Sequence, residues 1–166
     1  MSGFPEEILT LARKIITEFT ARGLMVATAE SCTGGLVAGA LTEISGSSAV
    51  VDRGLVTYTN IAKMEMLGVQ EGTLERFGAV SRETALQMAH GALVRSHADL
   101  AVAVTGIAGP NGGSAEKPVG LVHLAAKSKT GGVIHREMRY GNIGRDKVRL
   151  GTVMTALEML LELSQA

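Results

Sequence analysis

The segment at residues 28–35, Thr-Ala-Glu-Ser-Cys-Thr-Gly-Gly, brings the reactive side chains of this chain together in one short turn. A carboxylate, two hydroxyls and a thiol follow one another there, in Glu30, Ser31, Cys32 and Thr33. A serine attacks a carbonyl carbon only when a base lies nearby, so a nucleophilic Ser31 needs a partner from elsewhere in the chain. Its alternative role is structural, because serine is a common helix N-cap. Cys32 is the rival nucleophile, and we expect one of these two neighbours to point into a cleft and the other into the core.

A strand pattern and a helix pattern flank this turn. The apolar residues 24–27 predict a short buried strand before it, and apolar residues at helical spacing over 36–44 predict a helix after it. The carboxyl end of a strand is a common ligand site in α/β proteins. Backbone N–H groups at the start of the helix would bind an anion or stabilise a developing oxyanion. The residues expected to present them are Thr33, Gly34 and Gly35.

Lys63 is the candidate base for Ser31. Burial would lower the pKa of this lysine toward the range in which its amine accepts a proton, and Tyr58 would orient or relay that proton. The alternative for Lys63 is a solvated position on a helix. The spacing of the two residues is one too long for the Tyr-x-x-x-Lys pair of dehydrogenases. The four histidines fall within predicted strands or beside a helix, and we expect them at the surface or at the edge of the core.

Three predicted strands end in polar or glycine-rich turns, near Glu30, near Thr59 and at Thr105. The third turn opens a loop over residues 106–118 that is rich in glycine and proline. If the three strands are parallel and adjacent, their ends share one edge of the sheet and line one crevice. Ligand contacts at these turns are therefore expected from Glu30, Thr105, Gly106 and Gly109.

Arg145 and Arg149 begin the last predicted helix, at about residues 145–164. Cations in the first turn of a helix oppose its dipole, so their presence there points to a function. They stand four residues apart and therefore on one helix face. Two guanidinium groups beside free N–H groups form a site for a phosphate or a carboxylate. The alternative is a solvated helix start.

Apolar periodicity and glycine positions divide the rest of the chain into short elements. Residues 69–80 are expected to form a loop with one helical turn, and Asn60 is expected to cap the helix that it begins. The short link at 127–132 predicts an antiparallel hairpin, so we expect one mixed sheet with helices on both faces. Helices are predicted over residues 5–21, 60–67 and 81–94, and strands over 50–59, 100–105, 119–126 and 133–140.

Composition excludes several classes of protein. The 166 residues suffice for about one domain, and their 46% hydrophobic content is ample for a packed core. Sixteen Lys and Arg balance sixteen Asp and Glu without a basic run, which argues against a broad nucleic-acid surface. The single cysteine excludes an intramolecular disulfide and a cysteine-rich metal site. The chain has no apolar run of the ~20 residues that a membrane helix needs, and its first residues are acidic where a signal peptide would be basic. We therefore expect a soluble cytoplasmic protein.

Several segments, in order, resemble the CinA carboxy-terminal domain family, and the resemblance runs from about residue 5 to the C-terminus. The segments are Ala-Glu-Ser-Cys-Thr-Gly-Gly at 29–35, Tyr-Thr-Asn-Ile-Ala-Lys at 58–63, Gly-Ala-Val-Ser at 78–81, Val-Thr-Gly-Ile-Ala-Gly-Pro at 104–110 and Glu-Lys-Pro-Val-Gly at 116–120. The resemblance implies a three-layer α/β/α sandwich around a mixed five-stranded sheet with one strand antiparallel. It also implies a single domain over residues 1–166, in the stand-alone form that lacks the amino-terminal domain of larger relatives.

Members of this family act as nicotinamide mononucleotide deamidases. The resemblance therefore implies that this chain converts nicotinamide mononucleotide to nicotinate mononucleotide and ammonia, in pyridine nucleotide salvage, without a metal or another cofactor. Carried over by motif, Ser31 is the nucleophile, Lys63 the base and Tyr58 the proton partner, and the loop at 105–113 closes over the substrate. We expect Arg145 and Arg149 to hold the 5′-phosphate. The Met- and Ala-rich helices could support a homodimer or a higher homo-oligomer.

The chain departs from the family pattern at two places. A family segment often written Gly-Asp-Arg corresponds here to Ile-Gly-Arg at residues 143–145, without the aspartate, and Ile61 stands where relatives often have an acidic residue. One alternative is therefore a non-catalytic nucleotide-binding module with a role in competence or the DNA-damage response. Another is a hydrolase of the same type that acts on a different amide.

Overall fold

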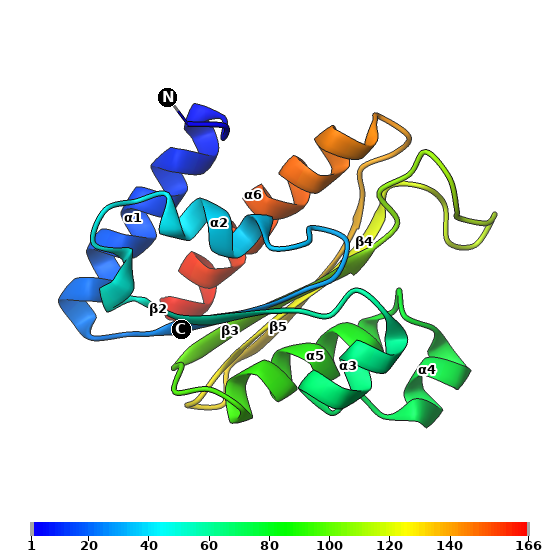
Figure 1. Ribbon diagram of the computed structural model, residues 1–166, viewed down its shortest axis with the longest axis horizontal. Helices are drawn as coiled ribbons and strands as arrows, with labels where there is room; N and C mark the ends of the chain where they lie inside the picture. Colours follow the sequence, from blue (N-terminus) through cyan, green and yellow to red (C-terminus); the bar gives the residue numbers. More distant parts are fainter. Residues whose placement is uncertain (1, 166) are drawn as a thin grey trace.

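A mixed sheet of five strands lies between two layers of helices (Figure 1). The computed structural model describes residues 2–165. The strand order is β2-β1-β3-β4-β5, and β1 pairs in parallel with both of its neighbours. β4 pairs antiparallel with β3 and β5, so it alone among these strands runs against the others, which confirms the predicted mixed sheet. The strands are β1 (Val26–Glu30), β2 (Val51–Val56), β3 (Leu100–Gly106), β4 (Leu121–Ser128) and β5 (Val133–Arg139).

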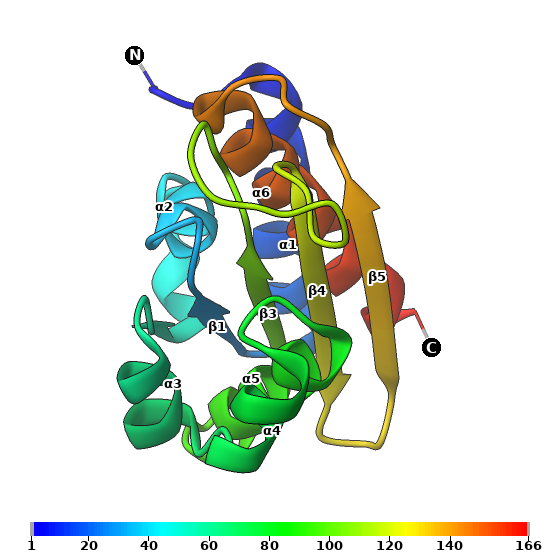
Figure 2. The same cartoon turned by 90° about the vertical axis from the view of Figure 1, so that its right-hand side faces the viewer.

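Each face of the sheet carries its own layer of helices and its own hydrophobic core (Figures 1 and 2). One layer contains α1 (Glu6–Arg22), α2 (Leu36–Thr42) and α6 (Arg145–Ser164), and the other contains α3 (Asn60–Leu67), α4 (Glu71–Phe77) and α5 (Arg82–Val94). The core beneath α5 consists largely of alanines, which lets this helix lie close to the sheet. The approach of α5 to α3 is so tight that a Cβ at Gly91 would lie 1.9 Å from the carbonyl oxygen of Leu67. Only glycine fits there.

Glycines and hydroxyl caps set most helix ends where the sequence predicts them. α1 ends at Gly23 and α3 at Gly68, both with positive φ, as expected for C-terminal glycines. α5 begins after Ser81, whose hydroxyl accepts from the N–H of Thr84 at 3.1 Å. α6 spans the predicted residues. Within residues 2–165, no helix combines the length and apolar character needed to cross a lipid bilayer.

β1 continues past the apolar run at 24–27 and ends at Glu30, where the sequence predicts the strand end, because parallel neighbours on both sides pair with its polar end. Two local predictions were wrong. The N-cap of α3 is Thr59, whose hydroxyl accepts from the N–H of Ala62 at 3.1 Å, so Asn60 is already the first helical residue. The expected loop with one helical turn contains the full helix α4.

Candidate active site

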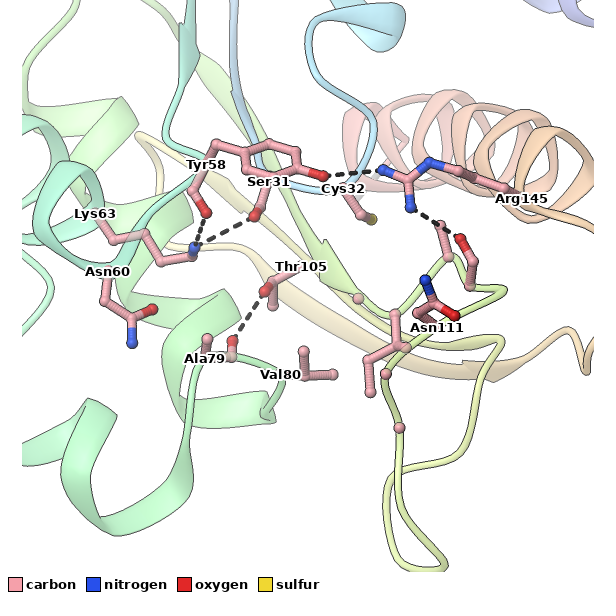
Figure 3. Close-up of a pocket in the computed structure, with 16 residues that line it drawn as sticks. Ser31, Cys32, Tyr58, Asn60, Lys63, Ala79, Val80, Thr105, Asn111 and Arg145 are labelled. Atoms are coloured by element: carbon pink, nitrogen blue, oxygen red, sulfur yellow. Dashed lines mark hydrogen bonds between the residues drawn. The ribbon is translucent and has the colours of Figure 1, made fainter.

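The carboxyl ends of β2, β1 and β3 meet at one edge of the sheet and open onto a cavity of about 300 Å³ (Figure 3). The three turns therefore come together as the sequence predicts. The predicted site residues that line the cavity are Ser31, Tyr58, Lys63, Thr105, Gly106, Gly109 and Arg145. The predicted site residues that lie outside its lining are Glu30, Thr33, Gly34, Gly35 and Arg149.

Ser31 and Lys63 lie against each other in the cavity (Figure 3). Nζ of Lys63, on α3, donates to Oγ of Ser31 at 3.2 Å and to the carbonyl oxygen of Tyr58 at 3.3 Å. Lys63 is only 2% exposed, and burial lowers its pKa from the ordinary 10.5. No carboxylate of residues 2–165 forms an ion pair with it. A lysine without a counter-ion in a buried site favours the neutral amine, which is the form that accepts a proton.

The thiol of Cys32 is buried and its charged form is disfavoured. Its side chain is 5% exposed and belongs to the core on the α6 side of the sheet. Burial raises the pKa of the thiol to about 11, against smaller opposing effects from its backbone N–H and from Arg149. Because the thiolate is the reactive form, a thiol that stays protonated at neutral pH reacts slowly. The hydroxyl of Ser31, by contrast, has a potential base beside it, the amine of Lys63 at 3.2 Å.

Tyr58 and Arg145 together frame the mouth of the cavity (Figure 3). The phenol oxygen of Tyr58 accepts from Nη2 of Arg145 at 2.9 Å, while Nη1 of Arg145 donates to the carbonyl of Gly109 at 2.9 Å. Among residues 2–165, the phenol bonds to neither Ser31 nor Lys63; the contact with Lys63 is made by the backbone carbonyl of Tyr58. The guanidinium thus joins the β2–α3 turn to the long loop that follows β3.

Glu30 faces away from the cavity and caps α2. Its carboxylate is 1% exposed and accepts from the N–H groups of Val37 at 2.8 Å and Ala38 at 3.0 Å. The hydroxyl of Thr33 donates to the same carboxylate at 2.6 Å. A carboxylate at a helix N-terminus satisfies free N–H groups and complements the dipole. Glu30 therefore serves the first turn of α2 and not a ligand.

Arg149 fastens the turn that carries Ser31. Its Nε donates to the carbonyl of Cys32 at 3.1 Å and its Nη2 to that of Thr33 at 3.2 Å. Within the turn, the N–H of Gly34 donates to the carbonyl of Ser31 at 3.0 Å. The turn is thus held rigidly, and the N–H next to the serine, that of Cys32, bonds to no backbone carbonyl among residues 2–165.

The connection between α4 and α5 contributes cavity residues that sequence reasoning missed. Ala79 and Val80 line the cavity, and the carbonyl of Ala79 accepts from the hydroxyl of Thr105 at 2.8 Å. In the sequence, Ala79 and Val80 stand out only as part of the segment at 78–81, which resembles the family. Asn60 and Asn111 also line the cavity, but their local pattern marks only a helix start and a loop.

Lys117 anchors the long loop, residues 107–120, to the helix layer that contains α4. Its Nζ donates to the carbonyl of Phe77 at 2.5 Å, at the C-terminal end of α4, where a cation complements the helix dipole. The loop carries Gly109 and Asn111 into the cavity lining. Its position over the site is therefore fixed at Lys117 and again at Arg145. Nowhere in residues 2–165 do three His, Cys, Asp or Glu side chains converge as a metal site would require.

Comparison with known proteins gives consistent matches over almost the whole chain. The model of the CinA C-terminal domain matches residues 8–164. The nicotinamide-nucleotide amidohydrolase PncC of Enterobacter agglomerans is 50% identical over 151 residues, which cover 91% of this chain and 92% of the relative. PncC of Escherichia coli K12 is 49% identical over 155 residues, 93% of each chain.

Solved structures agree with these matches. The crystal structure of the competence/damage inducible protein CihA from Agrobacterium tumefaciens superposes with a TM-score of 0.98 at 74% identity, over 99% of both chains. A CinA superfamily protein from Escherichia coli superposes with a TM-score of 0.90 at 36% identity, over 98% of this chain and 94% of that one. With this fold and these motifs in place, the chain belongs to the CinA C-terminal domain family.

Proposed function

We propose that this chain, as one domain over residues 1–166, hydrolyses the carboxamide of nicotinamide mononucleotide to nicotinate mononucleotide and ammonia. The observation that carries the proposal is the buried amine of Lys63 at 3.2 Å from Oγ of Ser31, inside a cavity. The names of the PncC relatives, half of whose residues are identical, support the choice of substrate. The reaction would serve pyridine nucleotide salvage in the cytoplasm. The expected homo-oligomer stays a prediction.

Ser31 acts as the nucleophile and Lys63 as the base. Oγ of Ser31 attacks the carboxamide carbon while its proton passes to the neutral amine of Lys63. The resulting ammonium returns this proton to the amide nitrogen as the C–N bond breaks and ammonia leaves. Water then attacks the nicotinoyl ester on Ser31, with Lys63 accepting the proton of the water and returning it to Oγ. No other group has to change its charge.

The N–H of Cys32 is the best-placed donor for the tetrahedral oxyanion. Cys32 follows the nucleophile directly and lines the cavity, and its N–H bonds to no backbone carbonyl among residues 2–165. Arg149 holds the carbonyls of this turn, so the donor is oriented before the substrate arrives. The sequence-based expectation was different, because it placed the oxyanion donors at residues 33–35. We assign Arg149 to this positioning role rather than to the phosphate.

Arg145 binds the 5′-phosphate in this proposal. A guanidinium has five N–H donors, and Arg145 uses two for Tyr58 and Gly109. The remaining donors, at the mouth of the cavity and at the N-terminus of α6, suit a phosphate on a ribose that extends outward. Tyr58 then acts in two ways: its carbonyl orients Lys63 and its phenol orients Arg145.

The purified wild-type protein is expected to release ammonia from nicotinamide mononucleotide in the presence of a chelator. It should act much more slowly on the riboside and on free nicotinamide, because neither carries the phosphate. Ammonia release and nicotinate mononucleotide formation are both measured, by a coupled assay and by chromatography. Tight binding of the nucleotide without product would favour a non-catalytic nucleotide-binding module instead. Faster turnover of another amide would identify that amide as the better substrate.

Replacing Arg145 by methionine is expected to raise KM for nicotinamide mononucleotide by roughly 10- to 100-fold, which corresponds to one lost charge-assisted contact. The activity on the riboside should change little, because that substrate has no phosphate. Arg13→Met, at an exposed arginine paired with Glu6 on α1, is the matched control and should keep the wild-type KM. An equal loss on both substrates in Arg145→Met would argue against phosphate binding.

A further inference from the structure

Thr57 carries a hydroxyl that is fully buried and has no hydrogen-bond partner. The residue is 0% exposed, and among residues 2–165 its Oγ1 is the one buried side-chain nitrogen or oxygen without a partner. Burying a hydroxyl unpaired costs free energy. A native fold that retains such a group calls for an explanation, and groups of this kind are found at catalytic sites.

The register of the sheet places Thr57 beside Ser31. Ala29 of β1 pairs with Leu55 of β2, and both belong to the core on the α5 side of the sheet. Side chains alternate along a strand, so the residues two positions further on, Ser31 and Thr57, follow on that same side. The N–H of Thr57 donates to the carbonyl of Glu30 at 2.8 Å, which continues the ladder past the end of β2.

The amine of Lys63 lies at this same point and lacks one acceptor. Its Nζ is 3.2 Å from Oγ of Ser31 and 3.3 Å from the carbonyl oxygen of Tyr58, the residue after Thr57. An ammonium has three N–H donors, and these contacts occupy two. No third acceptor for Nζ exists among the bonds of residues 2–165. A charged Lys63 therefore leaves one donor unpaired in a site where it is 2% exposed.

We propose that the hydroxyl of Thr57 is the third acceptor for the ammonium of Lys63 during turnover. The inference rests on the proposed function. When Oγ of Ser31 bonds to the carboxamide carbon, its proton moves to Lys63. One N–H of the new ammonium then faces the amide nitrogen, a second stays on the carbonyl oxygen of Tyr58, and a rotation of the Thr57 side chain turns Oγ1 toward the third. Without substrate the hydroxyl of Thr57 is unpaired among residues 2–165. The contact forms only with the charged amine, so it raises kcat rather than substrate affinity. Thr57 is a positioning residue that acts through Lys63.

The test compares Thr57→Val, which has nearly the same shape without the hydroxyl, with Thr57→Ser, which keeps it. The matched control is Thr152→Val, at a fully buried threonine on α6 whose hydroxyl donates to the carbonyl of Val148. In Thr57→Val we expect kcat for nicotinamide mononucleotide to fall about tenfold or more, with KM within about twofold of wild type. Thr57→Ser and Thr152→Val should keep the wild-type kcat.

Two further measurements separate this role from a structural one. Thermal unfolding of Thr57→Val should occur at the wild-type temperature or above it, because the substitution removes an unpaired buried hydroxyl. Titration of Lys63 by NMR, without substrate, should give a lower pKa in Thr57→Val than in wild type, because the charged amine has lost an acceptor. Cys32, Tyr58 and Arg145, the other ionisable groups facing the cavity, are the same in all variants.

An unchanged kcat and an unchanged titration of Lys63 in Thr57→Val would overturn the proposal. So would a loss of activity in Thr57→Val accompanied by a clearly lower unfolding temperature, since a structural role predicts that pattern. If wild type releases no ammonia from nicotinamide mononucleotide, the proposed function fails, but the titration of Lys63 still decides the role of Thr57.

Discussion

Ser31→Ala is expected to lower kcat for nicotinamide mononucleotide by roughly 10⁴-fold or more, the loss typical when a serine nucleophile is removed. Without Oγ, neither the C–O bond to the substrate nor the ester intermediate can form. The fold should persist, because the backbone of this turn is held by Arg149 and by the N–H of Gly34. Calorimetry should show that Ser31→Ala still binds the nucleotide with an affinity close to that of wild type.

Ser164→Ala is the matched control for this experiment, because Ser164 is also buried but lies in the last turn of α6. It should keep full activity. Turnover that survives in Ser31→Ala would remove the serine from the mechanism. If it then disappeared in Cys32→Ala, the thiol would become the nucleophile despite its raised pKa.

Lys63→Met is expected to lower kcat by about 10²- to 10⁴-fold while KM changes little. Methionine fills a similar volume but cannot accept the proton of Ser31. Lys63→Arg should be equally inactive, because a guanidinium stays protonated in proteins. Lys14→Met, at an exposed lysine near Glu18 on α1, is the control and should behave as wild type. Wild-type activity in Lys63→Met would rule out this lysine as the base.

The same lysine sets the expected dependence on pH. Only the neutral amine acts as the base, so kcat/KM of wild type should rise as the pH passes upward through the pKa of Lys63, which burial places below 10.5. This rise should be absent from Lys63→Met. Burying the charged amine of Lys63 costs free energy in the folded state. This cost lowers the stability of the folded protein at pH values below the lowered pKa of Lys63, and it vanishes above 10.5. The stability of wild type relative to Lys63→Met should therefore increase with pH over that interval.

The sequence was sufficient for the helices and strands other than α4 and for the sheet edge at which the candidate site lies. Apolar periodicity with Gly23, Gly68 and Ser81 marks helix ends because capping depends on residues next to each other in the chain. The short link between β4 and β5 predicts their antiparallel pairing for the same local reason. The meeting of the three strand ends also follows without coordinates, because carboxyl ends of adjacent parallel strands share one edge. Ser31 and Lys63 are thereby brought together from positions 32 residues apart.

The directions of the side chains and their partners were decided only by the tertiary structure. Glu30 turns to α2 and Arg149 to the carbonyls of the serine turn, although both were expected at the ligand. The phenol of Tyr58 accepts a hydrogen bond from Arg145, which is 87 residues away in the chain, and makes no bond to Lys63. The polar end of β1 lies within the sheet because two neighbouring strands pair with it, which its own composition does not show. Local propensity sets where elements begin and end, whereas the packing of distant elements sets which polar groups meet, and the charges and burial of the site depend on that packing.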